Sequence, residues 1–446
     1  MKKIVLILIV VLAVLATFSF IVKSSVNSEI KSKVEEIRAS GFDVSYNERF
    51  SIFSIKADGE VKITNPKEAL NYIVLLQEYE EQRENLQRVF ESFDEYLMSQ
   101  IFEGMVYEYD LNFYLLTSDL DLNIYLTKLS TILMQELDKS RQKQKVQLFI
   151  DMLKNRDIHI NLDEDLNYKL KDINLSNEDF EFILNGVNGS KSDMNIDLFE
   201  LTTTKAGVNI RLENIESNYK ESSKDEMISD FSIEKINFFA DKFDFRIDKL
   251  KIFSFSKVLQ NLLNNKTNIS FDKFYLNKID YYEDELKTEL NNIDLNFDLQ
   301  NFPFQEYKDF LNAYATMNID MQRFFEKAQI LLEAISDSKS NIKLKADSKD
   351  FIFQNLPIFK ELKIDGDIIV SENLNNMNFS NANDIFEKLY FEIKVDKESV
   401  KEAIIDGRVN RRNEIVIIET EDKKYNLFKI ELKEDGIFVN DSFKIR

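Results

Sequence analysis

The chain of 446 residues opens on an uncharged apolar run and then changes to alternating and helical patterns. Residues 4–22 carry no charge and follow Lys2 and Lys3. A helix of that length, at about 1.5 Å per residue, spans the roughly 30 Å of a bilayer core. Because flanking lysines stay in the cytoplasm, we predict a single-pass anchor of a bacterial inner membrane, with the chain from residue 24 in the periplasm. The predicted anchor includes Ile4, Leu8, Leu12, Leu15 and Val22.

A cleaved signal peptide is the alternative interpretation of this run, with residues 14–16 as a small-residue cleavage site. After the anchor segment 1–23, residues 24–40 have the composition of a short polar helix that ends at Gly41. Residues 42–64 then alternate between apolar and polar positions, which predicts strands with one buried face. Segment 24–65 is therefore expected to lead from the membrane into a sheet.

Segment 66–155 is predicted to be a helical pair joined through a β-hairpin. Asn65 and Pro66 are suited to the start of a helix over 66–101, and a second helical pattern covers 128–155. These helices either cover the sheet or project as a coiled-coil-like hairpin that meets a protein partner. The first helix carries a heptad seam, interrupted by Arg83, that consists of Tyr72, Leu76, Tyr79, Leu86, Phe90, Phe93 and Leu97.

Segment 156–446 is dominated by short alternating runs, seen best in 230–253 and 268–299. Such alternation is typical of antiparallel strands with one face in water. A broad apolar stripe predicts one helix over 303–336, and a short helix and three closing strands follow after residue 397. We therefore predict an α+β fold, in which the anchor is followed by a long curved antiparallel sheet with helices packed on it.

Phenylalanine on the alternating strands raises the question of what the apolar sheet face contacts. The chain holds 37 Phe and no Trp. Ordinary core packing explains such a face, but a concave face closed by the 303–336 helix is also suited to a lipid or another long apolar ligand. The residues of this candidate groove are Phe243, Phe245, Phe271, Phe274, Phe297, Met317 and Met321.

Composition argues against most catalytic and nucleic-acid chemistry. The formal charge is −21, which disfavours nucleic acid as a partner. The chain has no Cys, one His (His159) and nine Gly, so thiolate sites, multi-histidine metal sites and phosphate-binding glycine loops are not expected. We expect no cofactor, no metal and no enzyme activity, and a hydrolase that uses only carboxylates is the alternative.

Both ends of the chain resemble the YdgA-like family of exported bacterial proteins. At the N-terminal end the resemblance lies in residues 41–46, Gly-Phe-Asp-Val-Ser-Tyr, and 49–54, Arg-Phe-Ser-Ile-Phe-Ser. At the C-terminal end it lies in residues 425–427 and 436–440, with Asp441 where the family usually has Gly. The resemblance implies an exported envelope protein of the inner membrane. It supplies no catalytic residues.

Taken together, these patterns predict a membrane-anchored periplasmic envelope protein without catalytic activity. The first hypothesis is an interaction or assembly factor that binds an envelope protein through segment 66–155. The second hypothesis is a lipid-binding or apolar-ligand module that uses the phenylalanine-rich sheet face.

Overall fold

The computed structural model describes residues 32–445, with gaps at 51–53, most of 77–93, 115–116, 118, 140–142, 164, 166, 177–179, 205–206, 224, 280–283, 316–320, 373–384, 406–417, 422 and 442. The predicted anchor over 4–22 lies outside this part of the chain. Across the residues that are described, no helix is both long and apolar enough to cross a bilayer. The chain divides into two compact units, which are residues 1–177 with 185–191, and residues 178–184 with 192–446.

The first unit contains an antiparallel sheet in which consecutive strands pair. Its strands are β1 (Phe42–Phe50), β2 (Ser54–Ile63), β3 (Val106–Tyr114), β4 (Leu120–Lys128), β5 (His159–Asp163), β6 (Tyr168–Leu170), β7 (Ile173–Ser176) and β9 (Asn188–Gly189). The pairing runs from β1 through β5 to β6, which then pairs with β9. Because β5 pairs with β4, the sequence-based boundary at residue 156 cuts through this sheet.

Segment 66–155 contains four described helices and the predicted hairpin β3–β4. The helices are α2 (Pro66–Leu75), α4 (Glu95–Phe102), α5 (Thr131–Lys139) and α6 (Lys143–Lys154). The Asn65 side chain caps α2 by accepting from the Glu68 amide, as the sequence predicted. The expectation of one continuous helix over 66–101 is wrong, because Asp94 is extended and caps α4 through the amide of Leu97. The heptad seam therefore does not lie along a single helix.

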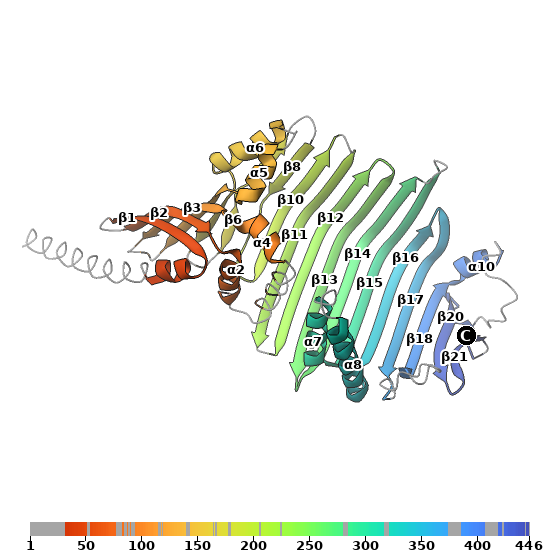
Figure 1. Ribbon diagram of the computed structural model, residues 1–446. Coiled ribbons are helices and arrows are strands. Elements are labelled where there is room, and N and C mark those ends of the chain that lie inside the picture. The colour runs from red at the N-terminus through yellow and green to blue at the C-terminus, as the bar shows by residue number, and fades with distance from the viewer. Residues whose placement is uncertain are drawn as a thin grey trace, which may run out of the picture. The chain divides into compact units, whose positions relative to one another are not determined.

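The second unit is a long antiparallel meander (Figure 1). Each strand from β10 to β18 pairs with the next, β18 pairs with β20, and β19 and β21 share the other edge of β20. The predicted α+β class with a large antiparallel sheet is confirmed. The strands are β8 (Phe180–Asn185), β10 (Asp193–Thr203), β11 (Val208–Ser223), β12 (Glu226–Ala240), β13 (Phe243–Leu259), β14 (Leu262–Ile279), β15 (Glu285–Pro303), β16 (Asn341–Phe353), β17 (Leu356–Val370), β18 (Phe386–Asp396), β19 (Ile418–Glu419), β20 (Tyr425–Lys433), β21 (Gly436–Val439) and β22 (Phe443–Ile445).

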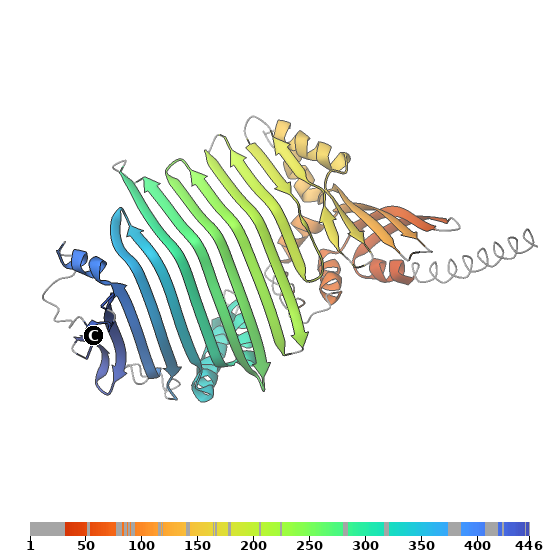
Figure 2. The same ribbon diagram turned by 180° about the vertical axis from the view of Figure 1, so that it is seen from behind.

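A crease crosses the strands of this sheet at one height, where Figure 2 shows them bend. The register places Asn214, Lys249 and Asn292 at one level on β11, β13 and β15, and their φ values of 51°, 54° and 49° interrupt the extended backbone there. All three residues are exposed. The Lys249 ammonium forms an ion pair with the Asp272 carboxylate on the neighbouring β14 at 2.8 Å. Residues with short or flexible polar side chains tolerate this left-handed backbone better than β-branched residues do.

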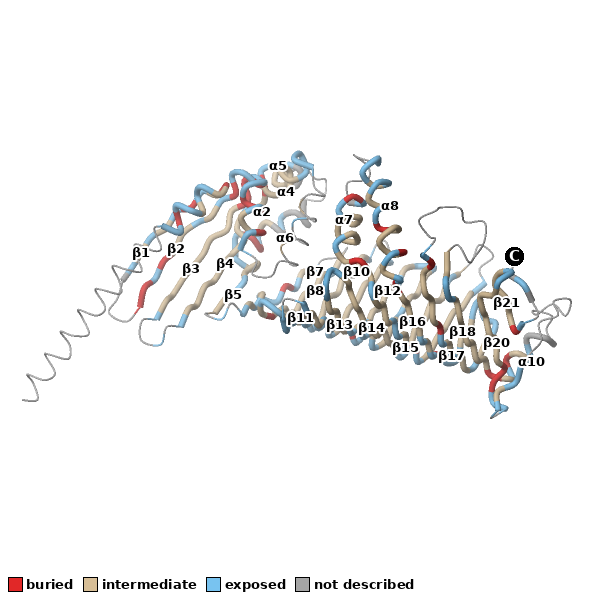
Figure 3. The backbone as a smooth tube through the Cα atoms, turned by 90° about the horizontal axis from the view of Figure 1, so that it is seen from below, coloured by how far each residue is buried: buried red, intermediate tan, exposed pale blue. Residues whose placement is uncertain are grey.

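The predicted helix over 303–336 is instead a helical hairpin. Helix α7 (Phe304–Ala315) ends before the gap at 316–320, and α8 (Met321–Ser338) packs back against it. Asp309 and Lys327 join the two helices at 2.6 Å. Figure 3 shows the hairpin rising from the sheet of the second unit, so it does not lie along the strands. The short helix expected near residue 397 is present as α10 (Lys397–Ile405).

Candidate functional site

The register of the second unit sorts its side chains onto one apolar and one polar face. Residues that pair directly across antiparallel strands point to the same side of the sheet. One such row crosses eight strands, from β12 to β20, and every member is apolar. Neighbouring strands lie about 4.8 Å apart, so the row is about 34 Å long. The members are Phe231, Ile252, Ile269, Leu295, Ala346, Ile364, Ile393 and Phe428.

The adjacent row, one residue along each strand, points to the opposite face and is almost wholly polar. It includes Lys251, Asp294 and Asp347. Because neighbouring residues of a strand point to opposite faces, this contrast identifies the wet side of the sheet. The alternation that the sequence predicts over 230–299 is therefore real and continues through β20.

The apolar face is partly exposed along its length and is not a filled core. No member of the eight-strand row is fully buried, and Figure 3 shows intermediate burial along most of β12–β18. Among the described strand residues of this face, full burial is concentrated beside the crease, where Ile215, Ile233 and Ile293 are each 8% exposed. A sheet face with a second layer on it shows many more residues at that level. Most of this face therefore has none of the described residues packed on it.

The predicted groove residues on the strands lie on the apolar face. Phe245 and Phe274 stack edge to face at 5.6 Å between ring centroids, and Phe243 packs on Phe238 at 5.5 Å. Phe297 is 37% exposed. Phe271 lies opposite the buried Ile293 and is half-buried.

The helical part of the predicted groove differs from the prediction. Met321 is 56% exposed at the start of α8, and Met317 lies outside the described residues. The helices reach the face where Phe302, the register partner of Leu263, packs on Tyr307 at 5.4 Å. The main strand contact of α8 is with β15. The expectation of a single helix over this stretch is therefore wrong, because α7 and α8 are separate helices that pack on each other through the Phe310 and Phe324 rings at 5.5 Å, while Phe325 stays 63% exposed.

Sequence reasoning also missed half of the apolar face. The rows on β16–β20 include Leu344, Ile368 and Phe391. Gly366 belongs to this face as well, and the Phe391 ring occupies the space where a Cβ on Gly366 would lie, at 2.4 Å. The alternation in 341–370 and 386–432 was the available signal, but only pairing through β15–β16 joins it to the earlier strands.

The heptad seam of the first unit is divided between packed and exposed positions. The Tyr72 ring packs on Phe42 at 6.3 Å, and its hydroxyl donates to Glu36 at 3.1 Å. Leu76 is 60% exposed, Leu97 is 37% exposed and Phe90 is half-buried. The remaining seam residues, Tyr79, Leu86 and Phe93, lie outside the described part of the chain.

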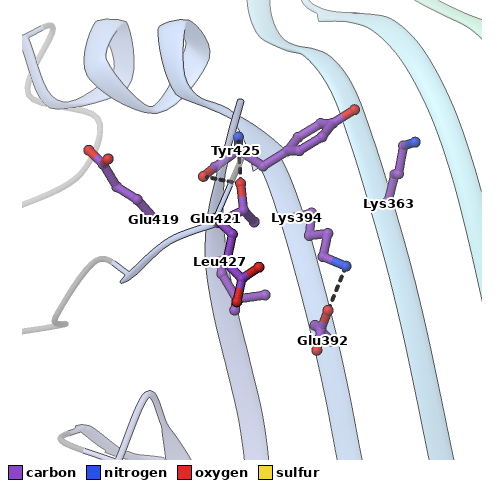
Figure 4. A pocket seen from close by; sticks show the side chains of 8 residues that line it. Lys363, Glu392, Lys394, Glu419, Glu421, Tyr425 and Leu427 are labelled. Atoms are coloured by element: carbon purple, nitrogen blue, oxygen red, sulfur yellow. Dashed lines mark hydrogen bonds and ion pairs between the residues drawn. The ribbon is translucent and has the colours of Figure 1, made fainter. Parts of the chain in front are cut away.

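A polar depression of about 540 Å³ lies at the C-terminal end of the second unit (Figure 4). Glu392 pairs there with Lys394 at 2.6 Å, and this contact lowers the pKa of the Glu392 carboxyl. Lys363 adds one further positive charge, and Glu419 and Glu421 add two further negative charges. A general acid at neutral pH needs a raised pKa, whereas the carboxyl groups with shifted pKa values in the described residues are all shifted downward.

His159 lies on the polar face of the first unit's sheet. Its ring packs against Tyr125 at 5.2 Å, and burial lowers its pKa. No group of three or more metal-ligating side chains occurs among the residues that the structure covers. The partly exposed apolar face is accordingly the best-defined candidate site of the second unit. No family model, no curated protein and no solved structure matches the chain.

Proposed function

We propose that this protein is a membrane-anchored, periplasmic lipid-binding protein that holds hydrocarbon chains on the apolar face of its second unit. The observation that carries the proposal is the partly exposed row from Phe231 to Phe428, apolar on all eight strands. Hydrocarbon has no hydrogen bonds to satisfy, so such a face needs no polar group to receive it.

The dimensions of the face match lipid chains. One leaflet contributes about half of the roughly 30 Å bilayer core, so an acyl chain extends about 15 Å, within the 34 Å row. The neighbouring rows of the same face mix apolar side chains with Ser254, Asn265 and Thr267, whose polar groups hydrogen-bond to one another. Covering each methylene of a ligand contributes about 0.8 kcal/mol, which favours an occupied face.

Tryptophan fluorescence tests this proposal, because the chain has no Trp. Phe297 is 37% exposed and pairs with Thr267 of β14. Phe253 is 44% exposed and pairs with Asn268, the next residue of β14. Because Thr267 and Asn268 point to opposite faces, Phe297 and Phe253 do so as well. The full-length chain carrying Phe297→Trp is reconstituted in vesicles of phospholipid with brominated acyl chains. We expect quenching of this Trp and none in the matched Phe253→Trp chain. Equal fluorescence of the two chains would contradict lipid binding on the apolar face.

An interaction role for the helices of the first unit is the second candidate function. Leu75 and Leu76 at the end of α2 are 68% and 60% exposed, and Tyr96 on α4, a helix that contacts α2, is 72% exposed. Large exposed apolar residues that cluster in this way are typical of protein contacts. Photo-crosslinkers placed at Leu76 and Tyr96 in cells would yield one defined protein partner, and a crosslinker at the exposed Lys67 is the control. Identical adducts at all three positions would exclude a specific interface.

A further inference from the structure

The first unit contains an apolar cavity of about 640 Å³ between helix 32–39 and its sheet. Val34 and Ile37 of the helix form one wall, and strands β1–β5 form the other. Val34, Val44 and Ala57 are at most 7% exposed, whereas Ile160 on β5 is 39% exposed. The cavity is therefore closed on the β1 side and open toward β5.

Specific backbone contacts hold the helix over the sheet. The Arg38 guanidinium donates from Nε to the Val44 carbonyl oxygen at 3.0 Å, which joins the helix to β1. The turn after the helix contains Gly41, whose φ is 88° and whose carbonyl oxygen accepts from the Thr64 and Asn65 amides at 2.9 and 3.0 Å. A Cβ on Gly41 would lie 2.5 Å from the Asn65 carbonyl oxygen. The chain therefore needs glycine to turn here and hold the helix above an open space.

The floor of the cavity is shaped by a glycine–tyrosine pair. Gly59 on β2 pairs with Tyr109 on β3, and a Cβ on Gly59 would meet the Ser45 carbonyl oxygen at 2.0 Å. The Tyr109 ring therefore lies across β2, and its hydroxyl donates to the Ser45 carbonyl oxygen at 3.2 Å. Because the hydroxyl of Tyr109 is hydrogen-bonded to β1, the apolar ring of this side chain lines the cavity.

The lining selects an apolar ligand. Apart from tyrosine hydroxyls, the one polar side chain of the lining is Lys33. Its ammonium pairs with Glu36 at 2.7 Å and the side chain is 61% exposed, so only the methylene stem contributes to the wall. A ligand that must be hydrogen-bonded in the interior finds little to bind. The volume lies within the range of about 300–1,000 Å³ that is usual for ligand sites.

We propose that this cavity, which is open at one end, is a second site that binds a single hydrocarbon chain of a bilayer phospholipid. The choice of a lipid rests on the proposed function and on the predicted anchor. Nine residues, 23–31, separate the apolar run from helix 32–39, and they reach at most about 30 Å. The cavity is therefore tethered within reach of the bilayer surface, where phospholipid is the abundant apolar ligand.

The experiment uses the full-length chain in vesicles of phospholipid with brominated acyl chains. Tyr46 lines the cavity, and Tyr125 lies on the polar face of the same sheet, opposite Glu108. We expect quenching of the Trp in the Tyr46→Trp chain and none in the Tyr125→Trp chain. Ile160→Glu at the open end, added to Tyr46→Trp, is expected to remove the quenching. Because Ile160 is partly in water, this variant keeps the fold, which far-UV circular dichroism checks.

The outcomes separate this inference from the proposed function. Quenching of Phe297→Trp without quenching of Tyr46→Trp would overturn the cavity site and leave the sheet face of the second unit supported. Quenching at Tyr46 that Ile160→Glu leaves unchanged would also overturn it, because the signal would then come from the bilayer surface. Loss of quenching at both Trp positions would reject both proposals.

Discussion

Truncation of the stacked rings Phe245 and Phe274 tests whether the apolar face is open to its surroundings. The two rings are half-buried, lie 5.6 Å apart and are inclined at 80°. We consider Phe245→Ala, Phe274→Ala and the double variant, each in the Phe253→Trp background. The Trp lies on the polar face of β13, so it reports unfolding of this sheet without touching either ring.

The expected decrease in the free energy of unfolding follows from the partial burial of the two rings. A fully buried Phe replaced by Ala costs about 3–5 kcal/mol, because lost transfer free energy adds to the energy of the cavity left behind. A ring that is at most about a third exposed loses about two thirds of a transfer term of about 1.5–3 kcal/mol, and an open face leaves no enclosed cavity. We therefore expect about 1–2 kcal/mol for each single variant. The edge-to-face contact adds a coupling of about 0.5–1.5 kcal/mol in the double-mutant cycle.

The free energies of unfolding come from urea titration of the full-length chain, followed by fluorescence of the single Trp. A decrease near 4 kcal/mol in the free energy of unfolding for each single Phe→Ala variant would refute the open face, since it requires a layer of side chains above the rings. A coupling close to zero would instead show that the two rings do not stack. A matched polar-face variant, Asn277→Ala, is expected to change stability by less than about 1 kcal/mol.

Three further predictions follow from individual contacts. Gly366→Val places methyl groups where the Phe391 ring lies, so we expect a loss of more than about 1 kcal/mol in the same urea titration, reversed in part by Phe391→Ala. Burial raises the pKa of Tyr109 to about 12, above its unfolded value near 10. Its contribution to the free energy of unfolding is therefore present below pH 10 and is lost as the pH rises through 12. Difference absorbance of the wild type against Tyr109→Phe checks this titration. Asp94→Ala removes the cap on the Leu97 amide and is expected to cost about 1 kcal/mol, with faster amide exchange at the start of α4.

The sequence identifies which side of each strand is apolar, but not what covers that side. Phe271 and Phe297 are correctly placed on one face because side chains alternate with a period of two. The break at Asp94 was missed because the heptad pattern continues through it, although an aspartate that caps a helix is a local signal. The sequence did not show that the apolar face continues onto β16–β20, because the whole α7–α8 hairpin lies between β15 and β16 in the chain. Local periodicity carries no information about the pairing of strands that are so far apart in sequence.

The crease explains how one continuous apolar face survives on strands of up to 19 residues. On β11, β13 and β15 the apolar positions step by three residues at the bend, from Leu212 to Ile215, from Ile247 to Leu250 and from Leu290 to Ile293. A flat strand would send the second residue of each pair to the polar face. The neighbouring β12 and β14 take the same step between the same rows, so register is kept across the bend. Five strands that change phase at one height preserve a single apolar surface above and below the crease. A sheet that only needed a stable core would gain nothing from keeping an uncovered row apolar on eight strands, whereas a sheet that holds a hydrocarbon chain needs such a row.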